Sequence, residues 1–105
     1  MTSQGPKKAT GSSAATPADY RTAAVWFKEI ANANRIGVMA LVSNGEQSVG
    51  DLSSALGISM SGVSRHLTRL RLCGLIQPKR RGQTMLYSLT PKGSQLLRIV
   101  EMVVR

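Results

Sequence analysis

Apolar residues recur every three to four positions in five segments of this chain, which is the spacing of an amphipathic helix. The segments are residues 19–31, 35–42, 48–56, 59–73 and 91 onward. The first helix is expected to begin near Ala18 or Asp19, where an acidic side chain favours a helix N-terminus. Between residues 73 and 91 the apolar positions alternate instead, which is typical of strands. The pattern predicts a mainly α domain of five helices with a small β-hairpin.

The third and fourth segments read as two short helices joined by a tight turn at Gly57-Ile58. Ser48 and Ser59 are good N-caps, and Gly57 ends the first of the two helices. The buried face of that first helix is predicted to contain Val49, Leu52, Ala55 and Leu56. Two short helices in this order predict a helix-turn-helix, whose second helix can enter the major groove of DNA.

The second helix of this pair has one apolar stripe and one polar face. At about 100° per residue, Val63, Leu67 and Leu70 point inward. The opposite face and its flank carry Ser61, Ser64, Arg65, Thr68 and Arg69. Short polar groups and arginines suit hydrogen bonds to base edges and phosphates. We expect Arg65 to contact a base and Arg69, one turn further on, to contact a phosphate.

Residues 75–78 and 85–89 are predicted strands, and residues 79–83 are the predicted tip of the hairpin between them. Pro78 cannot donate a ladder hydrogen bond, so its strand is expected either to lie at an edge or to end at Pro78. Three adjacent cations at a tip repel one another until a phosphate backbone or a minor groove supplies counter-charge. The tip residues assigned to DNA binding are Lys79, Arg80, Arg81 and Gln83. The complete prediction is a winged helix-turn-helix with a two-stranded antiparallel wing.

The last helix starts at Thr90-Pro91, a hydroxyl cap followed by a proline in the first turn. Its apolar stripe has little domain left to cover it, so we expect a second copy of the chain to do so, together with the first helix. The residues assigned to this dimer interface are Trp26, Phe27, Leu97, Val100 and Val104. The alternative is that the last helix folds back over its own core.

Length and charge narrow the class of protein further. A chain of 105 residues is enough for one small domain, expected over residues 19–105 after a disordered basic tail at 1–18. The net charge of +9 favours a polyanionic partner, and residues 58–90 contain six cations and no acid. No apolar run approaches the ~20 residues of a membrane span, so no membrane partner and a cytoplasmic location are expected.

Four runs of the sequence resemble the ArsR-type winged-helix repressors. The runs are Phe27–Arg35, Ser48–Leu52, Ile58–Leu67 and Cys73–Ile76, and the resemblance covers about residues 20–105. The ending Leu89–Gly93 also resembles MarR-type repressors. Both families consist of homodimeric bacterial or archaeal transcription factors, so the resemblance implies a protein at the prokaryotic nucleoid. It places Met60, Ser61, Ser64 and Arg65 at base-facing positions and residues 79–83 in the wing.

The sequence departs from the metal-sensing members of that family. Ser48 and Gly50 stand where those members carry a cysteine pair, and the last helix offers Arg98, Glu101 and Arg105 in place of a ligand set. A cationic arginine donates nothing to a metal, so neither a metal site nor a cofactor is predicted.

Two residues remain as candidate sensors. Cys73 lies near Arg71, a cation that could lower its pKa and favour redox chemistry, but it is also a small hydrophobe before the helix-ending Gly74. His66, the one histidine, lies beside the apolar stripe and is assigned a structural role. The sequence names no effector.

No set of nucleophile, acid and base stands at catalytic spacing, so no enzymatic activity is predicted. We expect a homodimeric repressor that binds a pseudo-palindromic site in double-stranded DNA. The alternative is a winged-helix module for protein interaction or for coating DNA without sequence preference.

Overall fold

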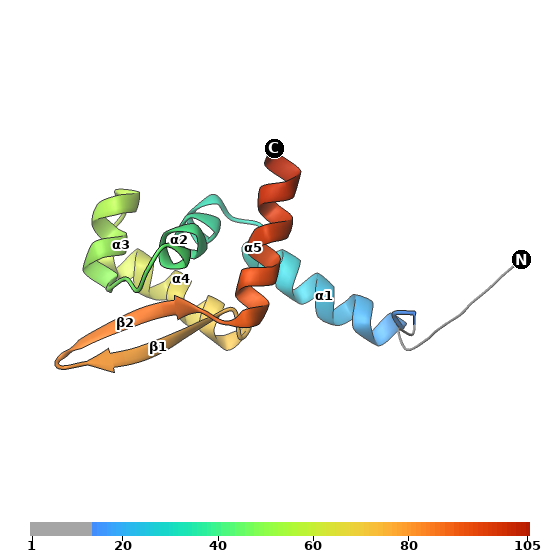
Figure 1. Cartoon of the computed structure of the whole chain (residues 1–105), viewed down its shortest axis with the longest axis horizontal. Coiled ribbons are helices and arrows are strands. Elements are labelled where there is room, and N and C mark those ends of the chain that lie inside the picture. The colour runs from blue at the N-terminus through green and yellow to red at the C-terminus, as the bar shows by residue number, and fades with distance from the viewer. Residues whose placement is uncertain (1–13) are drawn as a thin grey trace, which may run out of the picture.

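The computed structural model describes residues 14–105 and contains five helices and one antiparallel hairpin (Figure 1). The elements are α1 (Pro17–Ile30), α2 (Ala33–Ser43), α3 (Val49–Leu56), α4 (Met60–Leu72), β1 (Ile76–Arg81), β2 (Thr84–Leu89) and α5 (Pro91–Val104). The predicted fold class is confirmed: α3 and α4 form the helix-turn-helix, and β1 with β2 forms the wing. None of the described helices is long and apolar enough to cross a membrane.

Short polar side chains set where the helices begin. Thr16 and Asp19 form a capping box, so α1 starts at Pro17, slightly before the predicted start at Ala18 or Asp19. The gap at residues 32–34 between the first two predicted helices is occupied by a cap: the Asn32 side chain accepts a hydrogen bond from the Arg35 amide at 3.1 Å, and α2 begins at Ala33. Most of the predicted tail, residues 1–13, lies outside the described residues.

A single hydrophobic core joins all five helices to the base of the wing. Its buried members are Ile30, Val38, Met39, Val42, Leu52, Val63, Leu67, Leu70, Leu75, Ile76, Leu96 and Leu97. The predicted inward stripe of α4 is confirmed in full. One core assignment is wrong, because Ala55 is exposed. Only one side of α3 is covered, by α2 and α4, and Leu52 and Leu56 one turn apart occupy that side.

The wing is longer and its turn tighter than predicted. The strands pair from Ile76 opposite Leu89 to Arg81 opposite Thr84, which leaves a two-residue turn at Gly82-Gln83. Gly82 has φ 65°, and a glycine with positive φ closes such a turn directly. The predicted five-residue tip at 79–83 is therefore wrong, since Lys79, Arg80 and Arg81 belong to β1. Pro78 is tolerated because a strand in a two-stranded ribbon has a free edge.

The wing is attached to the body at its base and partway along β2. Tyr87 of β2 exchanges two backbone hydrogen bonds with Gln47, in the loop before α3, at 2.9 and 3.2 Å. At the base of the wing, the Thr90 hydroxyl caps α5 and donates to the Gly74 carbonyl at 2.6 Å. Gly93 of α5 is buried against the backbone of Leu75. These contacts fix the wing relative to the helix-turn-helix.

Helices α1 and α5 extend beyond this body (Figure 1). The Trp26 indole of α1 donates to the Cys73 carbonyl at the end of α4, at 3.2 Å, and the Lys92 ammonium of α5 lies 4.6 Å from the centre of its ring. Trp26 therefore links α1 to α4 and α5. Beyond these contacts both helices carry exposed apolar side chains, namely Tyr20, Val25, Phe27, Ile99, Met102, Val103 and Val104.

Candidate nucleic-acid interface

One face of α4 is built to remain open. The Ser59 side chain accepts a hydrogen bond from the Gly62 amide at 3.1 Å and fixes the first turn of the helix. Burial of Val63, Leu67 and Leu70 then sets the rotation of α4 about its own axis. The predicted base-facing residues Met60, Ser61, Ser64 and Arg65 are all exposed as a result. Farther along, Ser64, Arg65, Thr68 and Arg69 line a hollow of about 340 Å³.

The wing and the start of α4 share a second hollow of about 330 Å³. It is lined by Ser48, Val49, Gly50, Met60, Gln83, Thr84 and Met85. This groove brings the wing turn, the N-terminus of α3 and the N-terminus of α4 together. The N-terminus of α4 carries no acidic residue and attracts anions, whereas that of α3 is already paired with Asp51. The cations of β1 directly precede the wing turn in the sequence. We call this groove, the three cations of β1 and the open face of α4 the reading surface.

The charged and polar side chains of the reading surface differ in whether they already bind a partner within the described chain. Arg81 forms an ion pair with Glu46 at 3.1 Å. Lys79, Arg80 and Gln83 are exposed, and among the residues the structure describes none of their side chains is hydrogen-bonded. Arg65 is exposed on α4. Arg69 is different, because its guanidinium already donates two hydrogen bonds to Glu29 of α1. The sequence pattern of α4 gave no sign of this partner, which lies 40 residues earlier.

The five residues assigned to the dimer interface fall into two groups. Phe27 and Val104 are exposed and available to a second copy. Leu97 is buried in the core of its own chain, and Trp26 and Val100 are half-buried against that core. The alternative expectation for α5 thus applies to its first half, which packs on the core, while its last turn extends away from it.

Cys73 has an environment that disfavours thiolate chemistry. Burial raises the pKa of the thiol, Glu29 raises it further, and Arg69 and Arg35 offset only part of this effect. The net shift of this pKa is upward, opposite to the predicted lowering, and the cations that oppose it are Arg69 and Arg35, not Arg71. The backbone of Cys73 has a structural function instead, since its carbonyl accepts the Trp26 indole N–H.

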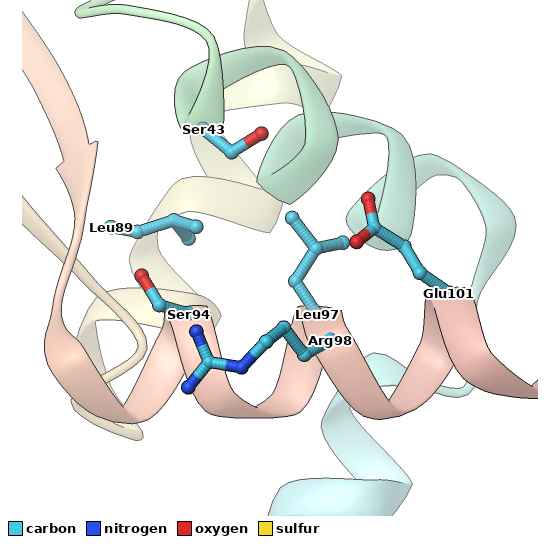
Figure 2. Close-up of a pocket in the computed structure, with 6 residues that line it drawn as sticks. All are labelled: Ser43, Leu89, Ser94, Leu97, Arg98 and Glu101. Atoms are coloured by element: carbon cyan, nitrogen blue, oxygen red, sulfur yellow. The ribbon is translucent and has the colours of Figure 1, made fainter.

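A smaller cavity of about 210 Å³ lies between α2, the end of β2 and α5 (Figure 2). Its lining consists of Ser43, Leu89, Ser94, Leu97, Arg98 and Glu101. Figure 2 shows the Arg98 guanidinium extending back along α5 toward Ser94, with the Glu101 carboxylate turned toward α2. Glu101 is the one carboxylate in this lining, and across residues 14–105 no group of three or more His, Cys, Asp or Glu side chains could hold a metal ion.

The fold and the reading surface define the class: this is a winged helix-turn-helix DNA-binding protein. Residues 32–77 match the family model described as bacterial regulatory protein, arsR family. The chain is 40% identical over 68 residues to the transcriptional activator HlyU of Vibrio cholerae, a match that covers 65% of this chain and 63% of HlyU. It is 41% identical over 66 residues to the arsenical resistance operon repressor of Escherichia coli, covering 62% of this chain and 56% of the repressor.

Solved structures agree with the sequence matches. Reduced HlyU from Vibrio cholerae superimposes with a TM-score of 0.75 at 31% identity, covering 82% of this chain and 92% of that one. The homodimeric winged helix-turn-helix domain of Mb0332 from Mycobacterium bovis gives a TM-score of 0.76 at 26% identity, covering 91% and 90% of the two chains. This chain belongs to the ArsR family of bacterial transcriptional regulators.

Proposed function

We propose that this protein binds a pseudo-palindromic site in double-stranded DNA as a homodimer and represses the adjacent promoter. The observation that carries the proposal is the open, arginine-bearing face of α4 beside a basic wing. Across α4 and the wing there is no acidic residue to repel phosphates. Because the target is chromosomal DNA, the protein is proposed to act in the cytoplasm at the nucleoid.

The homodimer is supported by the apolar residues that α1 and α5 leave exposed. Phe27 on α1 and Val104 on α5 belong to this set. An exposed apolar surface of this kind on a small domain is typical of an interface, and a second copy offers the same surface in return. The Mycobacterium bovis neighbour, described as homodimeric, has the same fold.

The division of labour within the reading surface follows from side-chain chemistry. A guanidinium can bridge two acceptors on a guanine edge, so we assign base recognition to Arg65, supported by Met60, Ser61 and Ser64. Lys79, Arg80, Arg81 and Gln83 on the wing are assigned to the DNA backbone, which carries no sequence information directly. Repression needs only that the bound dimer cover a promoter, and a domain of this size is sufficient for that.

Selection from a random duplex library tests the proposal. Full-length protein is expected to enrich a sequence with two half-sites about one helical turn apart. Binding to the enriched duplex should then resist an excess of shuffled duplex, since the affinity for a specific site exceeds that for non-specific DNA by about 10³-fold or more. Enrichment of no sequence, with binding lost in proportion to the length of the competitor, would instead indicate a protein that coats DNA without preference.

A further inference from the structure

Glu29, near the end of α1, is paired with two arginines from two other helices. Its Oε1 accepts a hydrogen bond from Arg69 Nε of α4 at 2.9 Å and another from Arg35 Nη1 of α2 at 3.0 Å. Its Oε2 accepts from Arg69 Nη2 at 3.1 Å. The Glu29 side chain is only 13% exposed, whereas that of Arg69 is 54% exposed. The carboxylate is thus sheltered from solvent, and both of its oxygens accept a hydrogen bond from Arg69.

Arg35 extends this network to the middle of α4. Its Nη1 also donates to the Glu29 backbone carbonyl at 2.9 Å, and its Nε donates to His66 Nδ1 at 3.2 Å. Since Nδ1 accepts this hydrogen bond, it is unprotonated and the His66 ring is neutral. Glu29 and Arg35 together hold α4 at two positions, His66 and Arg69, which lie three residues apart on one side of the helix. We call Glu29, Arg35, His66 and Arg69 the clamp.

The energetics favour keeping the clamp closed when DNA binds. If Arg69 left for a phosphate, the Glu29 carboxylate would lose a two-point, charge-assisted hydrogen bond and keep only the one from Arg35 at Oε1. An arginine fork that matches both carboxylate oxygens is also a precise geometric constraint, which a lysine cannot reproduce. Arg65, one turn earlier on the open face, has no such partner among residues 14–105.

We propose that Glu29 is a positioning residue for DNA recognition, and that Arg69 serves as its partner in the clamp and not as a phosphate ligand. Glu29 lies two residues after Phe27, on the helix that a second copy is proposed to cover. The clamp therefore sets the orientation of each reading helix relative to the dimer interface. Two half-sites at a fixed spacing can be read together only if that orientation is fixed. The inference rests on the proposed function.

A double-mutant cycle tests it with Glu29→Gln, Arg69→Gln and the double variant, and with Arg69→Lys, which keeps the charge but loses the fork. Each full-length variant is titrated against the duplex selected by the wild type and against a shuffled duplex of equal composition. The readout is the ratio of the two affinities. Circular dichroism and sedimentation show that each variant is folded and has the oligomeric state of the wild type. Arg71→Gln is the matched control, since Arg71 is an exposed cation of α4 outside the clamp.

The clamp predicts that the affinity ratio falls on the order of tenfold in both Gln variants and in Arg69→Lys. The double variant should fall no further than either single variant, because both remove one interaction. Arg71→Gln should lower the affinity for both duplexes together and leave the ratio unchanged. A purely structural contribution would not move the ratio, because loss of folded protein lowers both affinities equally.

Other results would overturn the inference. If Arg69→Lys keeps the wild-type ratio while Arg69→Gln weakens binding to both duplexes, Arg69 is a phosphate ligand. Losses that multiply in the double variant would likewise reject a shared interaction. Should Glu29→Gln not fold, the comparison of Arg69→Lys with Arg69→Gln decides alone. A wild-type protein with no preferred duplex would mean that the proposed function has failed, which is a separate result.

Discussion

Arg65 and Arg69 are one turn apart on α4, and the sequence gives them similar surroundings. Helical periodicity places both correctly on the exposed side, because it depends only on spacing within the helix. It cannot show that Glu29, on a helix 40 residues earlier, reaches Arg69. Burial around Cys73 is hidden for the same reason: its neighbours Trp26 and Glu29 come from α1. The features of a residue that depend on spacing within its own helix were predictable from the sequence. The features that depend on partners from distant helices were not.

Alanine substitutions separate base recognition from backbone binding. Arg65→Ala is expected to relax sequence choice at one position of each half-site, by about 1 to 3 kcal/mol of discrimination. Arg80→Ala removes an exposed wing cation and is expected to weaken binding evenly across sequences and to reduce the salt dependence. Affinities for single-base variants of the selected duplex measure both effects. Equal loss of discrimination in the two variants would reject this division of labour.

His66 gives the stability of the fold a pH dependence of known sign. Burial, aided by the Arg35 and Arg65 charges, holds the pKa of His66 below its ordinary value of 6.5. Below about pH 6.5 the unfolded chain therefore binds a proton that the folded chain resists, and stability falls as the pH falls. For one proton, the free energy of unfolding changes by at most about 1.4 kcal/mol per pH unit.

Urea unfolding from about pH 7.5 to about pH 5.5 measures this dependence, with His66→Asn as the control because its side-chain oxygen can still accept from Arg35. The depressed pKa values of Asp19, Glu29 and Asp51 act below their ordinary range near 4, outside this window. Identical slopes for the wild type and His66→Asn would show that His66 does not cause the effect.

Local sequence signals predicted the starts of α3, α4 and α5 better than the turn of the wing. Ser48, Ser59 and Thr90 were recognisable caps, and each begins a helix as predicted. The hairpin tip differs from the prediction because the cations at 79–81 are paired in β1, which leaves only Gly82-Gln83, with Gly82 at positive φ, to form the turn. Paired strands tolerate exposed cations well, and β1 is exposed along nearly its entire length.

The start of α5 packs closely against the backbone at Leu75. A methyl group at Gly93 would overlap the Leu75 carbonyl oxygen, which is backbone and cannot turn aside. We expect Gly93→Ala to destabilise the protein by about 1 to 3 kcal/mol or more in urea unfolding. Gly50→Ala in α3 is the matched control, because the nearest atom there, Ser48 Oγ, is 3.8 Å away. The control should gain up to about 1 kcal/mol from helix propensity, and a Gly93→Ala variant as stable as the wild type would contradict the described packing.

The exposed ends of α1 and α5 are the surfaces that we propose a second chain covers. Apolar stripes predicted an uncovered surface, but only the structure separates Leu97, which its own core covers, from Val104, which nothing in the described chain covers. The distinction arises because α5 leaves the core after its first half. Sequence alone could therefore predict an uncovered apolar surface but not its extent.

A charge placed on this surface should weaken the dimer. Val104 is 73% exposed on α5 and Leu72 is 74% exposed on α4, so lysine at either site adds the same charge at the same exposure. Val104→Lys is expected to raise the dissociation constant of the dimer about tenfold or more, since burying an unpaired charge is costly. Leu72→Lys should leave it unchanged. Sedimentation equilibrium measures both, and a Val104→Lys dimer as tight as the wild type would place the interface elsewhere.

In the proposed complex, two copies of α4 lie in successive major grooves of one duplex. Methylation protection at guanine N7, an atom of the major groove, reports this placement on the selected duplex. We expect two protected clusters about one helical turn apart, both lost in Arg65→Ala at concentrations where that variant is still bound. Protein bound without protection of any guanine N7, or protection spread evenly along the duplex, would contradict this placement.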